Sequence, residues 1–162
     1  MSQIWKPSVT VAAVVERDGR YLLVEEQTPA GLRINQPAGH LEFGESLVAA
    51  ARREALEETR HDFEPEALLG LYLLPTAADA AAVTYLRVAF TGRLGAEHAE
   101  RRLDAGIVRV LWLTREEIAA RRADLRSPLV LRCVDDHRAG RSAPLGLVHF
   151  EPQALGPLAG SA

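Results

Sequence analysis

Three glutamates lie on one side of a predicted helix at residues 46–59, and this cluster constrains the chain more than any other feature. Successive residues of an α-helix turn by about 100°, so Glu54, Glu57 and Glu58 fall within roughly one third of its circumference. Like charges four residues apart destabilise an isolated helix by about 0.2–0.5 kcal/mol, and carboxylates in the last turn face the negative end of the helix dipole. A hard divalent cation such as Mg2+, which binds oxygen ligands and phosphates together, reverses both effects. The segment therefore predicts a metal site for phosphate chemistry.

The same glutamates belong to a longer pattern of fixed spacing, Gly-x5-Glu-x7-Arg-Glu-x-x-Glu-Glu, which is formed by Gly39, Glu45, Arg53, Glu54, Glu57 and Glu58. This pattern resembles the signature of the Nudix hydrolases and matches six of its seven strictly specified positions. The mismatch is at the end, where the helix-stopping glycine of the family is replaced by Arg60. A glycine there adopts the left-handed C′ conformation at little steric cost. We therefore expect Arg60 either to accept strain in that conformation or to let the helix end differently.

The resemblance implies a role for each matching side chain. Glu57 and Glu58 would be metal ligands, and Glu54 would be either a ligand or the base that activates water. Arg53 would orient Glu54. The backbone carbonyl of Ala38 would complete the ligand set, and the cofactor would be Mg2+, with Mn2+ as the alternative.

Two further motif positions have supporting roles by the same resemblance. Gly39 would allow a tight backbone turn near phosphate, and Glu45 would hold the loop to the helix by a salt bridge to Arg53. Some family members add a carboxylate from a distant loop. The acidic residues in the corresponding region are Glu97, Glu100 and Asp104. We prefer Asp104, because it directly precedes a predicted strand.

Three stretches of the chain, residues 7–12, 35–42 and 125–130, carry a narrower resemblance to one bacterial phosphatase branch of the family. It implies release of orthophosphate from nucleoside tri- and diphosphates, thiamin pyrophosphate and hydroxymethylpyrimidine pyrophosphate. One alternative keeps the chemistry but changes the substrate to a nucleoside diphosphate derivative such as ADP-ribose. Another is a Nudix module that binds a nucleotide without cleaving it. Loss of motif carboxylates would mark that class, and here they are all present.

Length and composition predict a single domain. With 162 residues, 48% of them hydrophobic and 25% charged, the chain is long enough for one well-buried core. We expect a single Nudix hydrolase domain at residues 1–152. Residues 153–162 are rich in Pro, Gly, Ala and Ser, so we expect them to form a disordered C-terminal tail.

Charge and hydropathy limit the partners of the chain. A net charge of −3 gives no general attraction for nucleic acid or anionic membranes, so we expect a small-molecule phosphate substrate and no long nucleic acid. No apolar run approaches about 18 residues, and the N-terminus lacks the apolar core of a signal sequence, which predicts a cytoplasmic protein without membrane contact. The single cysteine, Cys133, cannot form an internal disulfide. A monomer and a homodimer are both compatible with the sequence.

Residue patterns outside the motif predict strands and loops. We expect residues 9–16 and 21–26 to pair as antiparallel strands through a hairpin turn at Asp18-Gly19. Further strands are expected at residues 33–36, 67–74, 82–90 and 107–113. Residues 37–44 and 92–105 are expected to be loops, the second of them mobile.

The same patterns predict helices on either side of these strands. A capping box of Thr114 and Glu117 indicates a helix to about residue 122. Ser127 and Pro128 offer an N-cap and a first helical residue for a helix to about residue 137. The elements together predict an α/β fold, a Nudix-type α/β/α sandwich with a mixed β-sheet between helices, which is also what the resemblance implies.

Several polar side chains outside the motif have two interpretations. His40, Arg33 and Arg87 could contact substrate phosphates, but isolated arginines on strands usually pair at the surface. Glu25 and Glu26 could approach the metal cluster at the end of their strand. We favour a solvent-facing pair for these two glutamates.

Overall fold

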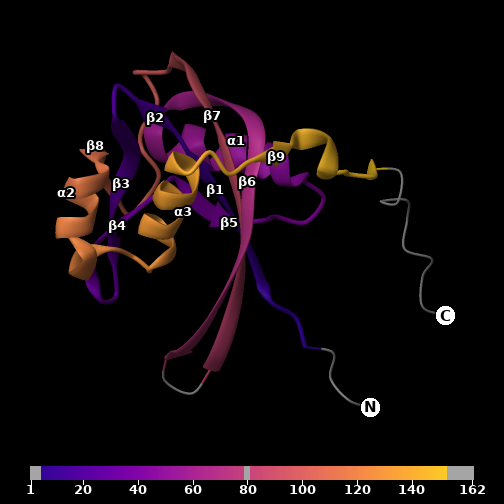
Figure 1. Cartoon of the computed structure of the whole chain (residues 1–162), viewed down its shortest axis with the longest axis horizontal. Coiled ribbons are helices and arrows are strands. Elements are labelled where there is room, and N and C mark those ends of the chain that lie inside the picture. The colour runs from indigo at the N-terminus through magenta and orange to yellow at the C-terminus, as the bar shows by residue number, and fades with distance from the viewer. Residues whose placement is uncertain (1–4, 79–80, 153–162) are drawn as a thin grey trace.

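The computed structural model describes residues 5–78 and 81–152. Among these residues the strands form two sheets, and three α-helices pack around them (Figure 1). The helices are α1 Leu47–Thr59, α2 Arg115–Ala120 and α3 Leu129–Arg138, together with the short 3-10 helices η1 Arg122–Asp124 and η2 Leu145–Leu147. No helix in these ranges is long and apolar enough to cross a membrane. The tail predicted at residues 153–162 lies outside the described residues.

The first sheet is mixed and has five strands in the order β5-β1-β7-β6-β9. An inner strand of this sheet, β1 Ser8–Val14, pairs antiparallel with β5 Ala38–His40 and parallel with β7 Ala81–Glu97. Beyond β7 the sheet continues with β6 His61–Ala78 and β9 Ala143–Pro144. The second sheet is antiparallel and consists of β2 Glu16–Arg17, β3 Arg20–Thr28, β4 Gly31–Asn35 and β8 Ile107–Thr114.

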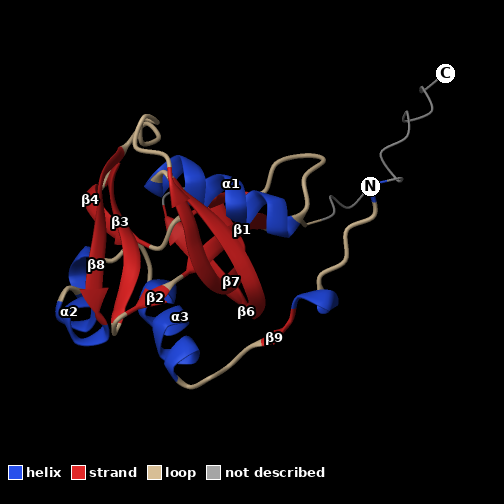
Figure 2. Ribbon diagram, turned by 90° about the horizontal axis from the view of Figure 1, so that it is seen from above, coloured by secondary structure: helices blue, strands red, loops and turns tan. Residues whose placement is uncertain are grey.

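Strand β1 separates two hydrophobic cores. Because successive side chains of a strand point to opposite faces, Val11 and Ala13 pack with α1, whereas Ala12 and Val14 pack with α2 and α3. Figure 2 shows α1 and α3 on opposite sides of the strands. The predicted α/β fold with a mixed sheet between helices is therefore confirmed.

The predicted pairing of residues 9–16 with residues 21–26 is wrong beyond the turn. The turn itself is confirmed, because Asp18 and Gly19 have φ values of 53° and 77°, as a type I′ hairpin requires. Only the short β2 continues the hairpin with β3, while β1 enters the other sheet. The side chains of β1 give the physical reason: four consecutive residues starting at Val11 are at most 1% exposed, which is the pattern of a central strand buried on both faces.

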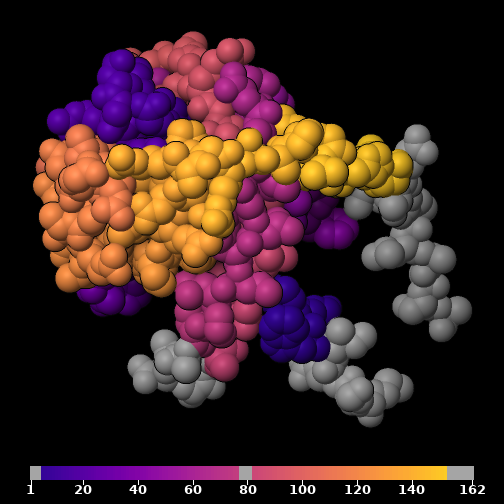
Figure 3. Space-filling view, viewed as in Figure 1, coloured from indigo at the N-terminus to yellow at the C-terminus, as the bar shows by residue number. Residues whose placement is uncertain are grey.

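The predicted loop at residues 92–105 is wrong in its first part, because β7 continues to residue 97 and pairs there with β6. Gly92 is not a loop signal here. A Cβ at this position would overlap the carbonyl oxygen of Glu64 on β6, so the glycine lets the two backbones approach closely. At their other end, β6 and β7 project from the body of the molecule as a two-stranded ribbon (Figure 3).

The predicted helix starts follow local hydrogen bonding. Ser46 caps α1, with its Oγ accepting a hydrogen bond of 3.0 Å from a backbone N–H of the first turn. Thr114 and Glu117 form the predicted capping box of α2. Helix α3 begins at Leu129, one residue later than expected, although Ser127 Oγ still accepts a hydrogen bond of 3.3 Å from the Leu129 N–H.

Helix α1 ends in the left-handed conformation, so Arg60 takes the first of the two outcomes we considered. Its φ and ψ are 63° and 17°, and its N–H donates to the carbonyl of Leu56 at 2.9 Å. The side chain forms few contacts that could offset the strain of this conformation. Its Nη2 lies 3.4 Å from Glu97 Oε1 in a partly exposed ion pair, and its Nε is buried without a hydrogen-bond partner in the described structure.

We predict that Arg60→Gly stabilises the protein by about 0.5–1 kcal/mol. Relief of left-handed strain contributes about 1–2 kcal/mol, and the greater freedom of glycine in the unfolded chain offsets part of it. Urea unfolding followed by circular dichroism would measure the change. Arg60→Ala is the matched control, since it removes the same side chain but keeps the strain. Equal effects of the two substitutions would show that strain is not the cause.

Candidate active site

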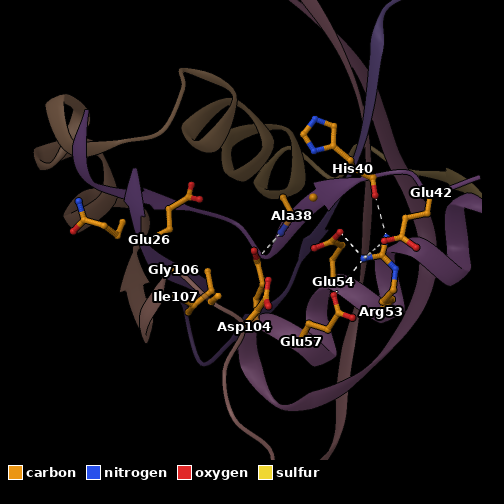
Figure 4. Close-up of a pocket in the computed structure, with 14 residues that line it drawn as sticks. Glu26, Ala38, His40, Glu42, Arg53, Glu54, Glu57, Asp104, Gly106 and Ile107 are labelled. Atoms are coloured by element: carbon orange, nitrogen blue, oxygen red, sulfur yellow. Dashed lines mark hydrogen bonds and ion pairs between the residues drawn. The ribbon is translucent and has the colours of Figure 1, made fainter. Parts of the chain in front are cut away.

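Carboxylates from four parts of the chain line one cavity of about 420 Å³ (Figure 4). Helix α1 contributes Glu54, Glu57 and Glu58, strand β3 contributes Glu26, the loop after β5 contributes Glu42, and the loop before β8 contributes Asp104. Strand β5 and Arg53 complete much of the remaining wall. The structure therefore brings together the motif glutamates that the sequence placed on one helix face.

Arg53 connects the motif glutamates to one another. Its guanidinium binds both carboxylate oxygens of Glu45, at 2.7 and 3.1 Å. It also donates to Glu54 Oε1 at 2.7 Å and to Glu57 Oε2 at 3.3 Å. A further bond of 3.0 Å runs from Nη2 to the carbonyl oxygen of His40 on β5. The predicted salt bridge between Glu45 and Arg53 is present, and this hydrogen bond holds the pKa of Glu45 below its usual value.

Glu58 is the most deeply placed carboxylate of the cluster. It is 8% exposed, and its Oε2 accepts a hydrogen bond of 2.9 Å from the Ala38 N–H. Burial raises the pKa of Glu58 to about 8, with a further increase from the charges of Glu54, Glu26 and Asp104. Burial also raises the pKa of Glu54, although Arg53 opposes the shift. The cavity thus holds more negative charge than its arginine neutralises.

The pairing of β5 with β1 directs Ala38 towards this cavity. Backbone hydrogen bonds join Pro37 to Ala13 and Leu41 to Val9, and Ala38 lies opposite Ala12 between them. Because hydrogen-bonded and non-hydrogen-bonded pairs alternate in an antiparallel ladder, the N–H and C=O of Ala38 both point away from β1. The N–H reaches Glu58, and the carbonyl faces the same side. This strand lies within the segment 37–44, which we had expected to be a loop.

Gly39 is required by the side chain of Glu54. A Cβ at position 39 would overlap the Glu54 carboxylate. The absence of that atom lets β5 and α1 approach closely enough for Glu54 to face the cavity. The glycine was predicted for a tight turn, but its role in the structure is close approach of a strand to a charged side chain.

Among the three candidates for a further carboxylate, only Asp104 lines the cavity. Its N–H donates to the carbonyl of Glu57 at 2.9 Å, which fastens the loop to the end of α1. Glu97 instead pairs with Arg60 at 3.4 Å, and Glu100 lies 3.7 Å from His98. Geometry therefore favours the residue that we preferred from the sequence.

Glu26 lies in the cavity wall, and our prediction of a solvent-facing pair is wrong for it. Glu25 does not line the cavity; it pairs with Arg109 at 2.8 Å, and its side chain is only 13% exposed. Adjacent strand residues point to opposite faces, which was a usable signal against a common orientation. The irregular register of β3 with β8 between these two residues was not visible in the sequence.

The donors of this cavity fit a hard divalent cation such as Mg2+. They are oxygens only, and the raised pKa of Glu58 indicates that a cation is needed to keep every carboxylate ionised. The side chains do not already converge on one point, since no described group of three or more His, Cys, Asp or Glu residues has the spacing of a metal site. Arg53 and the Ala38 N–H hold three of the glutamates in hydrogen bonds instead.

A second cavity of about 440 Å³ adjoins the first and differs from it in charge. The two share lining residues from β5 and Glu26. The second cavity is also lined by Arg33, Arg87 and Arg126 and by Ser127 and Leu129 at the start of α3. His40 and Tyr85, whose rings lie 6.3 Å apart, form part of its wall. An acidic and a basic cavity side by side suit a ligand that carries phosphate groups.

Comparison with known proteins supports this interpretation. A model of the NUDIX domain family matches residues 5–133. The chain is 37% identical over 147 residues to the phosphatase NudJ of Escherichia coli strain K12 and to that of Shigella boydii, covering 90% of this chain and 92% of each relative. A solved NUDIX hydrolase from Nitrosomonas europaea superposes with a TM-score of 0.86 at 47% identity, covering 91% of this chain and 99% of that one.

We predict that metal-free protein loses stability as the pH rises from about 5 to about 8. The pKa of Glu58 is raised to about 8 in the folded state but is near 4.5 in the unfolded chain, so between these values the folded protein binds the extra proton. Its stabilising contribution is complete below the unfolded pKa and is lost as the pH passes the folded pKa.

Urea unfolding in excess chelator at a series of pH values would measure this slope. Glu58→Gln should flatten it, whereas the control Glu64→Gln should keep it, because Glu64 forms an exposed pair with Arg52 outside the cavity. Identical slopes for the wild type and Glu58→Gln would contradict the assignment.

Proposed function

This chain belongs to the Nudix hydrolase family, and we propose that it is a Mg2+-dependent phosphohydrolase that releases orthophosphate from small diphosphate and triphosphate compounds. The candidate substrates are nucleoside tri- and diphosphates, thiamin pyrophosphate and hydroxymethylpyrimidine pyrophosphate. The observation that carries the proposal is the buried excess of negative charge around Glu58, next to a cavity lined by arginines. Similarity to NudJ phosphatases supports the choice of reaction. We further propose residues 1–152 as the single catalytic domain.

The proposed cation ligands are Glu57, Glu58 and the Ala38 carbonyl, with Glu54 and Asp104 as further candidates. Mg2+ is the expected ion and Mn2+ the alternative, because all of these donors are hard oxygens. When bound, the ion would neutralise charge on the phosphate and lower the pKa of the attacking water.

We propose that Glu54 accepts the proton of the attacking water. Arg53 binds its Oε1 at 2.7 Å, which leaves Oε2 to accept a proton or to bind the cation. Burial raises the pKa of Glu54, and a carboxylate whose pKa is closer to neutral is a better general base at that pH. Arg53 is a positioning residue in this scheme, since it fixes Glu54 and Glu57 relative to β5.

The proposal predicts that Glu57→Gln lowers kcat/KM by about 10–100-fold or more, since a direct ligand should matter at least as much as an indirect one. Its side chain is 38% exposed, so the fold should tolerate the change. Wild-type activity should also vanish in excess chelator and return with Mg2+ or Mn2+. Glu64→Gln serves again as the control outside the cavity. Wild-type kinetics in Glu57→Gln, or full turnover with chelator, would contradict the proposed site.

The proposal also predicts which products form from a nucleoside triphosphate. The diphosphate should appear first and the monophosphate second, with orthophosphate rising at each step, and thiamin pyrophosphate should give thiamin monophosphate. Chromatography of the nucleotides with a colorimetric phosphate assay would follow this order. If monophosphate and pyrophosphate appear together from the start, the proposed site stands but the proposed release of orthophosphate is wrong. Much faster cleavage of ADP-ribose would favour a pyrophosphatase of nucleoside diphosphate derivatives, and binding without any turnover would favour a non-catalytic module.

A further inference from the structure

Arg87 is a buried cation whose hydrogen-bond partners are neutral. It lies on β7, opposite Thr10 of β1 and Tyr72 of β6, and is 7% exposed. Its guanidinium donates to Gln36 Oε1 and to Asn35 Oδ1, both at 3.1 Å. In the described part of the chain, no carboxylate lies within ion-pair distance of it.

The two amides that hold Arg87 are themselves fixed. The side-chain N–H of Gln36 donates to the Val130 carbonyl at 2.8 Å, and that of Asn35 donates to Glu26 at 3.4 Å. Each amide consequently turns its oxygen towards the guanidinium. This arrangement orients the positive charge, and the carboxylates of Glu26 and Glu58 attract it without forming an ion pair with it. A buried charge without a directly bonded counter-charge is unfavourable, so stability alone does not explain why an arginine is buried here.

The missing negative charge can be supplied by a ligand in the basic cavity. Arg87 lines this cavity together with Ser127 and Leu129 at the start of α3, where the helix dipole adds positive potential. Arg126 lines it too, but its Nε lies 3.7 Å from Glu26 Oε1 and so already has a carboxylate nearby. Arg33 also lines the cavity, but its Nη1 donates to the carbonyl of Leu32 at an exposed position. Arg87 is therefore the buried cation of this cavity without a paired carboxylate.

The position of Arg87 relative to the acidic cavity indicates which anion it receives. Both cavities are lined by Ala38, Gly39, His40 and Glu26, so they adjoin along β5, and a ligand that extends past this strand would have groups in both. A phosphate held at the carboxylates would be the one that is cleaved. The next phosphate along the same chain would lie in the basic cavity.

We propose that Arg87 is a specificity-determining residue that binds the phosphate retained by the product, the one adjacent to the phosphorus that is attacked. This inference rests on the proposed function for the identity of the ligand. It assigns Asn35 and Gln36 as positioning residues, whose amide oxygens orient the guanidinium of Arg87 towards that phosphate. Substrates with at least two linked phosphates should be preferred over phosphate monoesters, which can fill only one of the two cavities.

Binding of product to chelated protein tests the proposal without any turnover. Isothermal titration calorimetry would compare AMP, CMP, GMP and UMP with the matching nucleosides. The wild type should bind the monophosphates more tightly than the nucleosides. Arg87→Met should lose about tenfold or more of that difference, because a charge-assisted bidentate contact is removed. Arg93→Met is the matched control on the same strand, where Arg93 is exposed and paired with Glu66; it should bind like the wild type.

Two further variants keep the test decisive if Arg87→Met does not fold. Arg87→Lys retains the charge but loses the fork, and it should raise KM for a nucleoside triphosphate more than it lowers kcat. Asn35→Asp gives Arg87 an internal counter-charge, and it should weaken monophosphate binding while nucleoside binding is unchanged. A purely structural arginine would not separate phosphate from nucleoside binding in this way.

The outcomes distinguish this inference from the proposed function. If monophosphates bind no better than nucleosides, or if Arg87→Lys and Arg87→Met bind them like the wild type, the role of Arg87 is overturned even when orthophosphate is released. If binding depends on Arg87 but the products include pyrophosphate from the start, the phosphate subsite stands and the proposed reaction fails.

Discussion

The guanidinium of Arg53 is the contact on which the site geometry depends. Two of its nitrogens bind the Glu45 carboxylate, and the same group reaches Glu54, Glu57 and the carbonyl of His40. These partners come from the loop before α1, from α1 itself and from the edge strand β5. One planar side chain therefore fixes the distance between a helix and a strand. It can do so because the fork of arginine presents several donors in a rigid plane, which the single ammonium of lysine cannot match.

The same contact leaves a charge imbalance that explains the chemistry of the cavity. Arg53 binds Glu45 through both carboxylate oxygens, whereas it contacts only one oxygen each of Glu54 and Glu57. Glu58 receives only a backbone N–H from Ala38, and burial raises its pKa to about 8. Apolar packing of α1 on β1 contributes to the burial of Glu58. The fold therefore favours a Glu58 carboxyl group that is protonated or bound to a cation. If Glu58 is a cation ligand as proposed, stability and function act in opposite directions at this residue, as is common in active sites.

The sequence was sufficient for features that depend on neighbours within one helix or turn. The spacing of Glu54, Glu57 and Glu58 and the capping box of Thr114 and Glu117 both follow from helical geometry, whereas the conformation of Arg60 was left open between two outcomes. Features that depend on pairing between distant segments were harder to predict from the sequence. Strand β1 leaves the hairpin and joins the other sheet because it pairs with β7, which follows more than sixty residues later. The orientation of Glu26 was predicted wrongly because the irregular pairing of β3 with β8 depends on the tertiary structure.

Strand β5 shows how a short, unpredicted element decides what the motif can do. Its three residues separate an acidic cavity from a basic one, and residues of this strand line both. On one side, the Ala38 N–H and Gly39 set the positions of Glu58 and Glu54. On the other, the preceding residues hold Arg87 in a fixed orientation. In the proposed reaction, the carboxylates would define where a phosphorus atom is attacked, but not which phosphorus of a chain arrives there. That choice would depend on how far the remaining phosphates extend beyond β5, and hence on a side chain that lies outside the motif.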